Sequence, residues 1–193
     1  MLYGWSTAAA SNIKLSHSDG HPRARFPLPV RLESSGDPVL DASARRALTD
    51  WNALSRAALG VAAFVEAPGG DASIVVTLAL PDASRLMGQT FLTADSGGVI
   101  AVPVRIDIAR PQARGQTTPE TILYQVFAHE LGHALGLAHV SDPRSIMCCI
   151  EGSVDFGDPA QREAYLEARR HPVVSSVERQ LVEHYERFWR QHP

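Results

Sequence analysis

Apolar residues recur every three or four positions in the segment that covers residues 40–59. The members of this stripe are Leu40, Ala44, Leu48, Trp51, Leu54 and Ala58. Such spacing places the side chains on one face of an α-helix. Asp41 can cap the start of this helix, and Gly60 can end it because glycine adopts the left-handed conformation at little cost. The pattern therefore predicts an amphipathic helix whose apolar stripe faces the core.

A second helical pattern covers residues 119–135. Thr118 can cap it, Pro119 suits the first turn, and Glu120 follows as an acid near the helix start. Ile122 and Val126 begin its apolar face, together with their neighbours Leu123 and Phe127. We expect this helix to run to about residue 135.

Two further helices are predicted near the C-terminus. Asp158 can start a short helix that ends before Pro172, because proline disfavours helix in the residue before it. Ser175 and Glu178 have the spacing of a capping box for a last helix. One side of that helix is lined by Val177, Leu181, His184, Tyr185 and Phe188.

Between the first two helices the pattern changes to short apolar runs separated by turn residues. The predicted strands are 26–32, 61–66, 73–80, 89–94 and 99–108. Turns rich in Gly, Pro, Asp and Ser separate them at 68–71, 81–84 and 95–98. Because residues 74–78 are apolar and mostly β-branched, that run suits a buried strand.

Composition indicates one globular domain and excludes some functions. The chain has 193 residues, of which 45% are hydrophobic, and 18 Lys and Arg stand against 21 Asp and Glu for a net charge of -3. Without a basic surplus, nucleic acid is not an expected partner. No apolar run approaches the roughly 20 residues that span a bilayer. We expect an N-terminal arm at 1–25, a single domain at 26–193, and a monomer.

The N-terminal residues and the two cysteines do not indicate the cellular compartment. The first residues lack the basic leader and apolar centre of a secretory signal, so the chain is either cytoplasmic or made with a leader that has been removed. Cys148 and Cys149 are adjacent and cannot form a spaced disulfide framework. We expect two reduced, partly buried thiols here in preference to a vicinal disulfide or a redox role.

The segment 129–139 combines three histidines at spacings that suit a metal. On a helix, His129 and His133 project from one face one turn apart, where both can bind the same zinc ion. Gly136 can adopt the left-handed conformation that ends the helix. The chain then turns back, so that His139 can reach the same zinc ion as third ligand. Three ligands leave a fourth position open for water, as catalytic zinc sites require.

Glu130 follows the first histidine and is placed beside the metal without being a ligand. Its carboxylate can take a proton from zinc-bound water as the water attacks a carbonyl, and can pass that proton to the leaving amine. The segment therefore predicts a zinc-dependent endopeptidase with one catalytic Zn²⁺, held by His129, His133 and His139, and Glu130 as catalytic base.

The string H-E-x-x-H-x-x-G-x-x-H resembles the metzincin zinc-peptidase signature at every specified position. Met147, eight residues after His139 in the triplet Ser-Ile-Met, is similar to the Met-turn that supports the metal in that clan. The amino-acid sequence from His129 to Leu137 looks most like that of the matrixins, the group that contains the matrix metalloproteinases. Residues 47–51 and 97–100 are more weakly similar to matrixin segments.

This resemblance implies an α+β, zincin-like metzincin catalytic domain, with a twisted five-stranded mixed sheet, three main helices and an active-site cleft at 119–150. It implies that an antiparallel edge strand borders the cleft and that a protein or peptide substrate lies extended along it. Gly88–Ala94 is the candidate for that strand. It also implies a secreted or periplasmic protein whose signal peptide is absent from this sequence.

Some features depart from animal matrixins. The link at 81–88 is short and lacks histidine, so we expect no second zinc and no calcium site. Val140 stands where matrixins have serine, and the 152–174 stretch is longer than their link to the last helix. No cysteine precedes the site, so cysteine-switch latency cannot operate within this chain. For the remaining histidines we expect solvated or capping roles; they are His17, His21, His171, His184 and His192.

Three alternatives remain open at this stage. One keeps the chemistry but narrows the target to a single processing site or to cell-wall peptides. Another is a catalytically inactive zinc-binding interaction protein, although Glu130 beside an open position argues against it. The third is an archaemetzincin-like protein, although the cysteines of those proteins are spaced to bind a second zinc and Cys148 and Cys149 are not.

Overall fold

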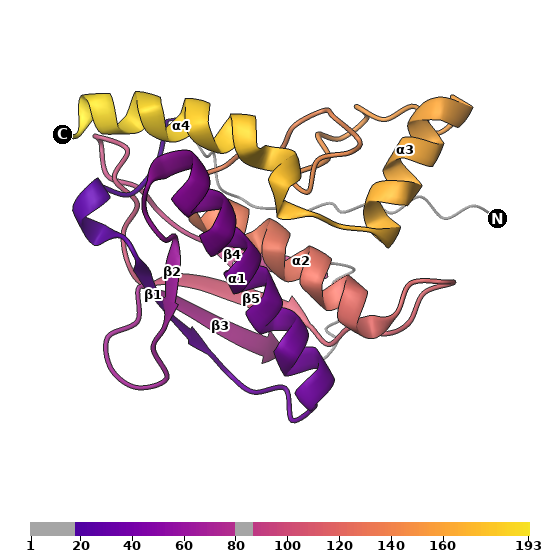
Figure 1. The fold of residues 1–193 in the computed structure, drawn as a ribbon, viewed down its shortest axis with the longest axis horizontal. Helices are drawn as coiled ribbons and strands as arrows, with labels where there is room; N and C mark the ends of the chain where they lie inside the picture. Colours follow the sequence, from indigo (N-terminus) through magenta and orange to yellow (C-terminus); the bar gives the residue numbers. More distant parts are fainter. Residues whose placement is uncertain (1–17, 80–86) are drawn as a thin grey trace.

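The computed structural model describes residues 18–79 and 87–193 (Figure 1). Its helices are α1 (Pro38–Leu59), α2 (Pro119–Ala134), α3 (Pro159–Arg170) and α4 (Glu178–Gln191), with short 3-10 turns η1 (Arg23–Arg25) and η2 (Val174–Val177). Its strands are β1 (Leu28–Leu32), β2 (Phe64–Glu66), β3 (Ile74–Ala79), β4 (Gly88–Phe91) and β5 (Val104–Ala109). The predicted turn at 81–84 lies outside the described residues.

The five strands form one mixed sheet in the order β2-β1-β3-β5-β4. The first four are mutually parallel, and β4 runs antiparallel to β5 at the edge. Along β5, buried Val104, Ile106 and Ile108 alternate with more exposed residues, so one face of the sheet turns to the core. This arrangement confirms the predicted α+β fold and the antiparallel edge strand.

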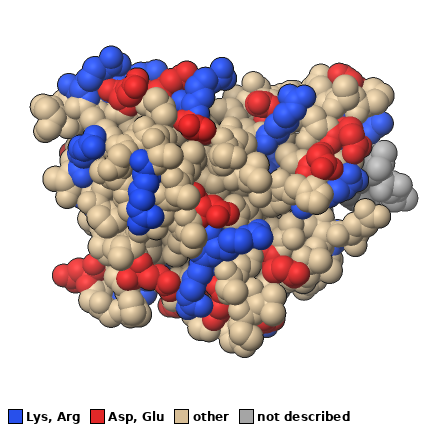
Figure 2. Space-filling model, viewed as in Figure 1, with Lys and Arg blue, Asp and Glu red and all other residues tan. Residues whose placement is uncertain are grey.

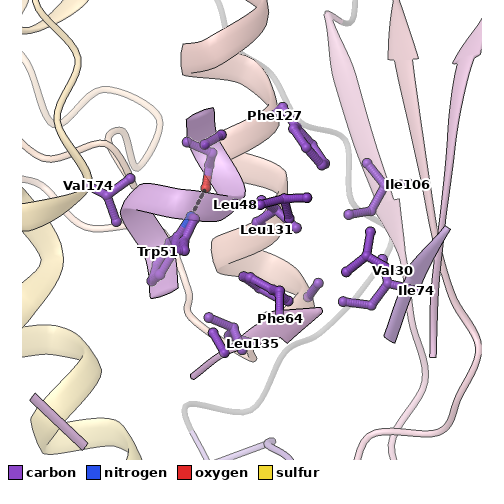
Figure 3. Close-up of a cluster of buried hydrophobic side chains, with 14 of the residues drawn as sticks. Val30, Leu48, Trp51, Phe64, Ile74, Ile106, Phe127, Leu131, Leu135 and Val174 are labelled. Carbon is purple, nitrogen blue, oxygen red and sulfur yellow. Dashed lines mark hydrogen bonds between the residues drawn. The ribbon is translucent and has the colours of Figure 1, made fainter. Parts of the chain in front are cut away.

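Helices α1 and α2 pack side by side on that face of the sheet (Figure 1). Figure 3 shows the core between them: Leu48 of α1 and Leu131 of α2 meet Ile74 and Ile106 of the sheet. Because α2 contacts α1 as well as β4 and β5, it is enclosed and carries apolar residues over most of its surface.

The first helix begins two residues before its apolar stripe, and its cap lies one turn before the predicted one. Asp37 is the cap, since its side chain accepts hydrogen bonds from the backbone N–H groups of Val39 and Leu40. The prediction that Asp41 caps the helix is wrong: its carboxylate accepts from Ser34 and Ser35 in the preceding loop. A proline at the first helical position explains the early start. The predicted end at Gly60, with φ of 73°, is confirmed.

The two C-terminal helices agree with the prediction, except in how the last one starts. Asp158 caps α3, and the helix ends before Pro172 as predicted. The predicted capping box is wrong because Ser175 lies inside η2, and no side chain caps α4. The apolar side of α4 is buried as expected, from Leu181 to Phe188.

The predicted strand at 99–108 is interrupted. Only Val104–Ala109 joins the sheet, while Val99 and Ile100 form isolated bridges with Gly20 and Ala94. Proline at position 103 has no N–H to donate to a ladder, which accounts for the break.

Residues 18–25 pack against the domain. Gly20 pairs with Val99, and the imidazole of His21 is fully buried, 2.9 Å from the carbonyl oxygen of Ala134 at the end of α2. His184 of α4 is buried as well. Neither histidine is solvated, because contacts between distant segments enclose them, although the contact of His21 with the last residue of α2 is the capping role that the sequence left open. His17 lies outside the described residues.

Charges of both signs are interspersed among uncharged groups on the face of the molecule in Figure 2. Within the described residues, no helix is long and apolar enough to cross a membrane. The mixture of charges on this face agrees with the net charge of -3.

Trp51 offers a test of the packing between α1 and α2. Its indole N–H donates a 3.0 Å hydrogen bond to the carbonyl oxygen of Ala128, and its ring packs edge-on against Phe64 (Figure 3). We expect Trp51→Phe to lower the free energy of unfolding by about 2–4 kcal/mol, because it removes a buried hydrogen bond and core volume.

Chemical denaturation followed by circular dichroism measures this change. The exposed Val39→Ala on the same helix serves as control and should change stability by less than about 0.5 kcal/mol. A Trp51→Phe protein as stable as the wild type would contradict this account of the core.

Candidate metal centre

Helix α2 is buried in the core and carries three of the candidate site residues. His129, Glu130 and His133 lie in its last two turns, and all three side chains are buried. Polar groups in such a position require partners, because an unsatisfied buried group costs about 1–3 kcal/mol. The partners of these three residues define the site.

Three imidazole nitrogens converge at the end of α2. The Nε2 atoms of His129, His133 and His139 are each 3.1 Å from the other two. Within the part of the chain that the structure describes, these histidines are the one group of three or more His, Cys, Asp or Glu side chains able to hold a metal ion. The link at 81–88, which bears on a second zinc, falls mostly outside that part.

Backbone carbonyls orient two of the three rings. Nδ1 of His129 lies 2.8 Å from the carbonyl oxygen of Ile146, and Nδ1 of His133 lies 2.8 Å from that of Leu137. Since a carbonyl only accepts, each Nδ1 carries the proton and donates, which leaves Nε2 as a bare lone pair. Lone pairs that face one another at 3.1 Å repel unless a cation lies among them. The donor set therefore fits a metal such as zinc, which favours imidazole nitrogen.

Burial also keeps the imidazoles in the protonation state that ligation requires. It lowers the pKa of His133 to about 4 and the pKa of His139 below its usual value. The pKa of His129 is lowered well below its usual value, first by burial and then by the neighbouring imidazoles. All three rings are thus neutral at pH 7 before any metal binds.

The chain reverses at Gly136 to bring the third histidine back. Gly136 has φ of 86°, and a Cβ atom there would collide with the backbone carbonyl oxygen of Asp19. The N–H of Leu137 returns to the carbonyl of Gly132 at 2.9 Å. The predicted left-handed end of this helix is therefore confirmed, and only glycine suits it.

Glu130 lies beside the cluster and contacts the edge strand. Its Oε2 accepts a 2.7 Å hydrogen bond from the hydroxyl of Thr90, in the middle of β4. Burial raises the pKa of Glu130 to about 7, and the hydrogen bonds from Thr90 oppose that rise. A cation among the imidazoles would lower this pKa, because it favours the carboxylate.

The edge strand approaches α2 closely because of a glycine. A Cβ atom at Gly88 would lie 2.6 Å from Cγ1 of Val126 and 2.8 Å from Oε1 of Glu130. Sequence reasoning named Gly88–Ala94 as the edge strand but missed both Thr90 and Gly88 as neighbours of the carboxylate. Their contact with Glu130 depends on how β4 packs against α2, which no local motif encodes.

Met147 packs against the helix between the two histidine turns. It is fully buried, and a Cβ atom at Gly132 would collide with its sulfur. Its backbone carbonyl accepts from the N–H of Val140, the residue after His139. The methionine thus lies against both the helix and the loop that carry the three clustered histidines.

The two cysteines that follow differ from the expectation. Cys148 and Cys149 form a vicinal disulfide, so the prediction of two reduced thiols is wrong. Cys148 is buried against Val154 and Tyr165, a residue of α3. The turn after Met147 holds both side chains together in a way that adjacency in the sequence does not specify.

Comparison with known sequences agrees with this geometry. No curated protein matches the chain. The sequence profile of the matrixin family matches residues 33–155, from the loop before α1 to the segment after the disulfide. Since that match covers well over half of the chain and includes the whole histidine cluster, the chain belongs to the matrixin family.

Proposed function

We propose that the protein is a zinc-dependent endopeptidase in which His129, His133 and His139 hold one zinc ion and Glu130 is the general base. The observation that carries the proposal is the convergence of three bare imidazole nitrogens beside a buried carboxylate that is not one of the ligands. Family membership supports the same conclusion.

Zinc bound by three imidazoles supplies a Lewis acid that polarises a carbonyl oxygen and makes water more acidic. The role of Glu130 is to accept a proton from the attacking water and return it to the departing amine, so no proton is lost or gained overall. The hydroxyl of Thr90 holds the carboxylate in place through the 2.7 Å hydrogen bond.

The inactive zinc-binding alternative accounts less well for Glu130. A buried carboxylate is costly unless its oxygens are bonded, and among the described residues it has no cationic side chain as partner. A structural zinc site closes with a fourth protein ligand and needs no base. A carboxylate beside a three-ligand site is typical of hydrolysis.

Strand β4 supports a peptide as substrate. It is the last strand in the sheet order, and its residue Thr90 touches the base. An extended peptide can add to such an edge strand through backbone hydrogen bonds. Because these bonds do not depend on side chains, peptides of different sequence can bind in the same register. The chain therefore offers a way to place a peptide bond next to Glu130.

The first test is metal content. We expect the purified chain to bind one zinc ion, and His133→Ala to weaken binding by more than about 100-fold, since loss of supporting partners alone costs 10- to 100-fold. Competition with a chelator, followed by elemental analysis, measures both. The exposed His171→Ala serves as matched control and should leave zinc binding unchanged. Two tightly held zinc ions, or a His133→Ala chain that keeps its metal, would contradict the assignment.

The second test removes the base. Glu130→Ala should keep its zinc, because Glu130 is not a ligand and alanine suits a helix. Cleavage of an unfolded protein panel should fall about 100- to 10,000-fold, the usual contribution of general base catalysis. The exposed Glu163→Ala is the control. Comparable cleavage by zinc-loaded Glu130→Ala would assign the base to another group.

The third test concerns Thr90. Thr90→Val keeps the shape but removes the hydrogen bond that opposes the rise in the pKa of Glu130, so this pKa should rise further. Because the base acts when ionised, the acidic limb of the pH profile of kcat/KM should move to higher pH. We expect activity at neutral pH to fall about 10-fold, while Thr90→Ser retains it. An unchanged pH profile in Thr90→Val would show that Thr90 does not support the base.

A further inference from the structure

The guanidinium of Arg169 is buried near the metal centre without a carboxylate partner among the described residues. Arg169 lies in the last turn of α3 and is 4% exposed. Its Nη2 donates one long hydrogen bond of 3.4 Å to the carbonyl oxygen of Cys148, and no acceptor for its Nε–H lies within the part of the chain that the structure describes. The ion pairs of this helix involve its exposed neighbour Arg170 instead.

Such a charge does not stabilise the fold. Arginine keeps its proton in proteins, although burial lowers its pKa here and the nearby Tyr165 opposes that change. Removing a cation from water without a counter-charge is costly, and one long hydrogen bond together with the contacts to Tyr165, whose ring lies 4.7 Å away, offsets little of that cost. The position therefore calls for an additional partner.

The surroundings of Arg169 are rich in hydrogen-bond donors. Among the described residues, the buried hydroxyl of Ser153 has no partner, and the buried hydroxyl of Tyr165 has none except Arg169, from which it can only accept. Tyr165 belongs to the same small cluster as Val154, the neighbour of Ser153. A guanidinium N–H only donates, and both hydroxyls can donate. The complementary ligand is an anion with several acceptor atoms, and a carboxylate matches the two-pronged geometry of arginine.

This donor group lies next to the ligating histidines. Cys148, which Arg169 contacts, is two residues from Ile146, whose carbonyl accepts from Nδ1 of His129. Helix α3 also contacts α2. After burial and the other imidazoles, the charge of Arg169 contributes to the lowered pKa of His129, which agrees with a short separation.

We propose that Arg169 recognises a carboxylate of the peptide bound at the metal centre, so that the enzyme prefers acidic substrates. This inference rests on the proposed function, because it assumes a peptide beside Glu130. The carboxylate can belong to an Asp or Glu side chain near the cleaved bond or to the C-terminus of the peptide. Helix α3 lies beyond residues 33–155, so this selectivity belongs to a segment outside the family match.

Peptide binding tests the inference without requiring cleavage. Zinc-loaded Glu130→Ala protein is titrated with fluorescent peptides in which Glu or its neutral isostere Gln occupies one position at a time. A parallel pair ends in a free carboxylate or an amide. We expect the peptide with Glu at one particular position, or the peptide with a free C-terminal carboxylate, to bind about 10-fold tighter than its neutral counterpart. A charge-assisted hydrogen bond allows a difference of this size.

Matched variants separate recognition from a structural role. Adding Arg169→Met should abolish the preference for the charged peptide and leave binding of the neutral one within about threefold, whereas Arg170→Met should change neither. A purely structural arginine would weaken both peptides alike. Arg169→Lys keeps the charge without the two-pronged geometry and should show a reduced preference, which provides a second variant if Arg169→Met does not fold.

The outcomes are distinct. Equal binding of charged and neutral peptides at every position and at the terminus overturns the inference, as does a preference that persists in Arg169→Met. Failure of the wild-type chain to cleave any peptide would instead defeat the proposed function, because the binding comparison does not depend on hydrolysis.

Discussion

The enclosure of α2 between α1 and the sheet is the constraint on which the site depends. Because this helix is buried, each polar group on it requires a partner from another segment. The ring of His129 finds one in the loop before Met147, and that of His133 in the turn after the helix. These hydrogen bonds fix both rings so that their free nitrogens meet that of His139. Packing of the core thus determines the geometry of the candidate metal centre.

Close approach of backbone to helix completes the site. Gly88 lets the edge strand reach Glu130, Gly132 lets the sulfur of Met147 reach the helix, and Gly136 allows the chain to turn against Asp19. At each of these positions a methyl group would meet another atom at less than van der Waals distance. Glu130, Met147 and His139 are therefore held in place by the same means.

The sequence was sufficient to predict features that depend on local spacing. The apolar stripe of α1, the turn at Gly136 and the convergence of the three histidines each follow from residues close together along the chain. The edge strand was predicted from the family resemblance and its position was confirmed.

Features that depend on contacts between distant segments were not predictable in this way. Thr90 bonds to Glu130 across 40 positions, and His21 to the end of α2 across 113. Nothing near Arg169 in the sequence distinguishes it from Arg170, yet one is buried and the other exposed. In each case a side chain acquires its environment only when α2, α3 or the edge strand has packed.

X-ray absorption spectroscopy at the zinc edge of the metal-loaded chain tests the central claim most directly. The account predicts a first shell of three imidazole nitrogens and one water oxygen, all at about 2.0–2.1 Å. Sulfur in the first coordination shell, from Cys148 or Cys149, would contradict it. So would a fourth protein ligand that closes the position next to Glu130.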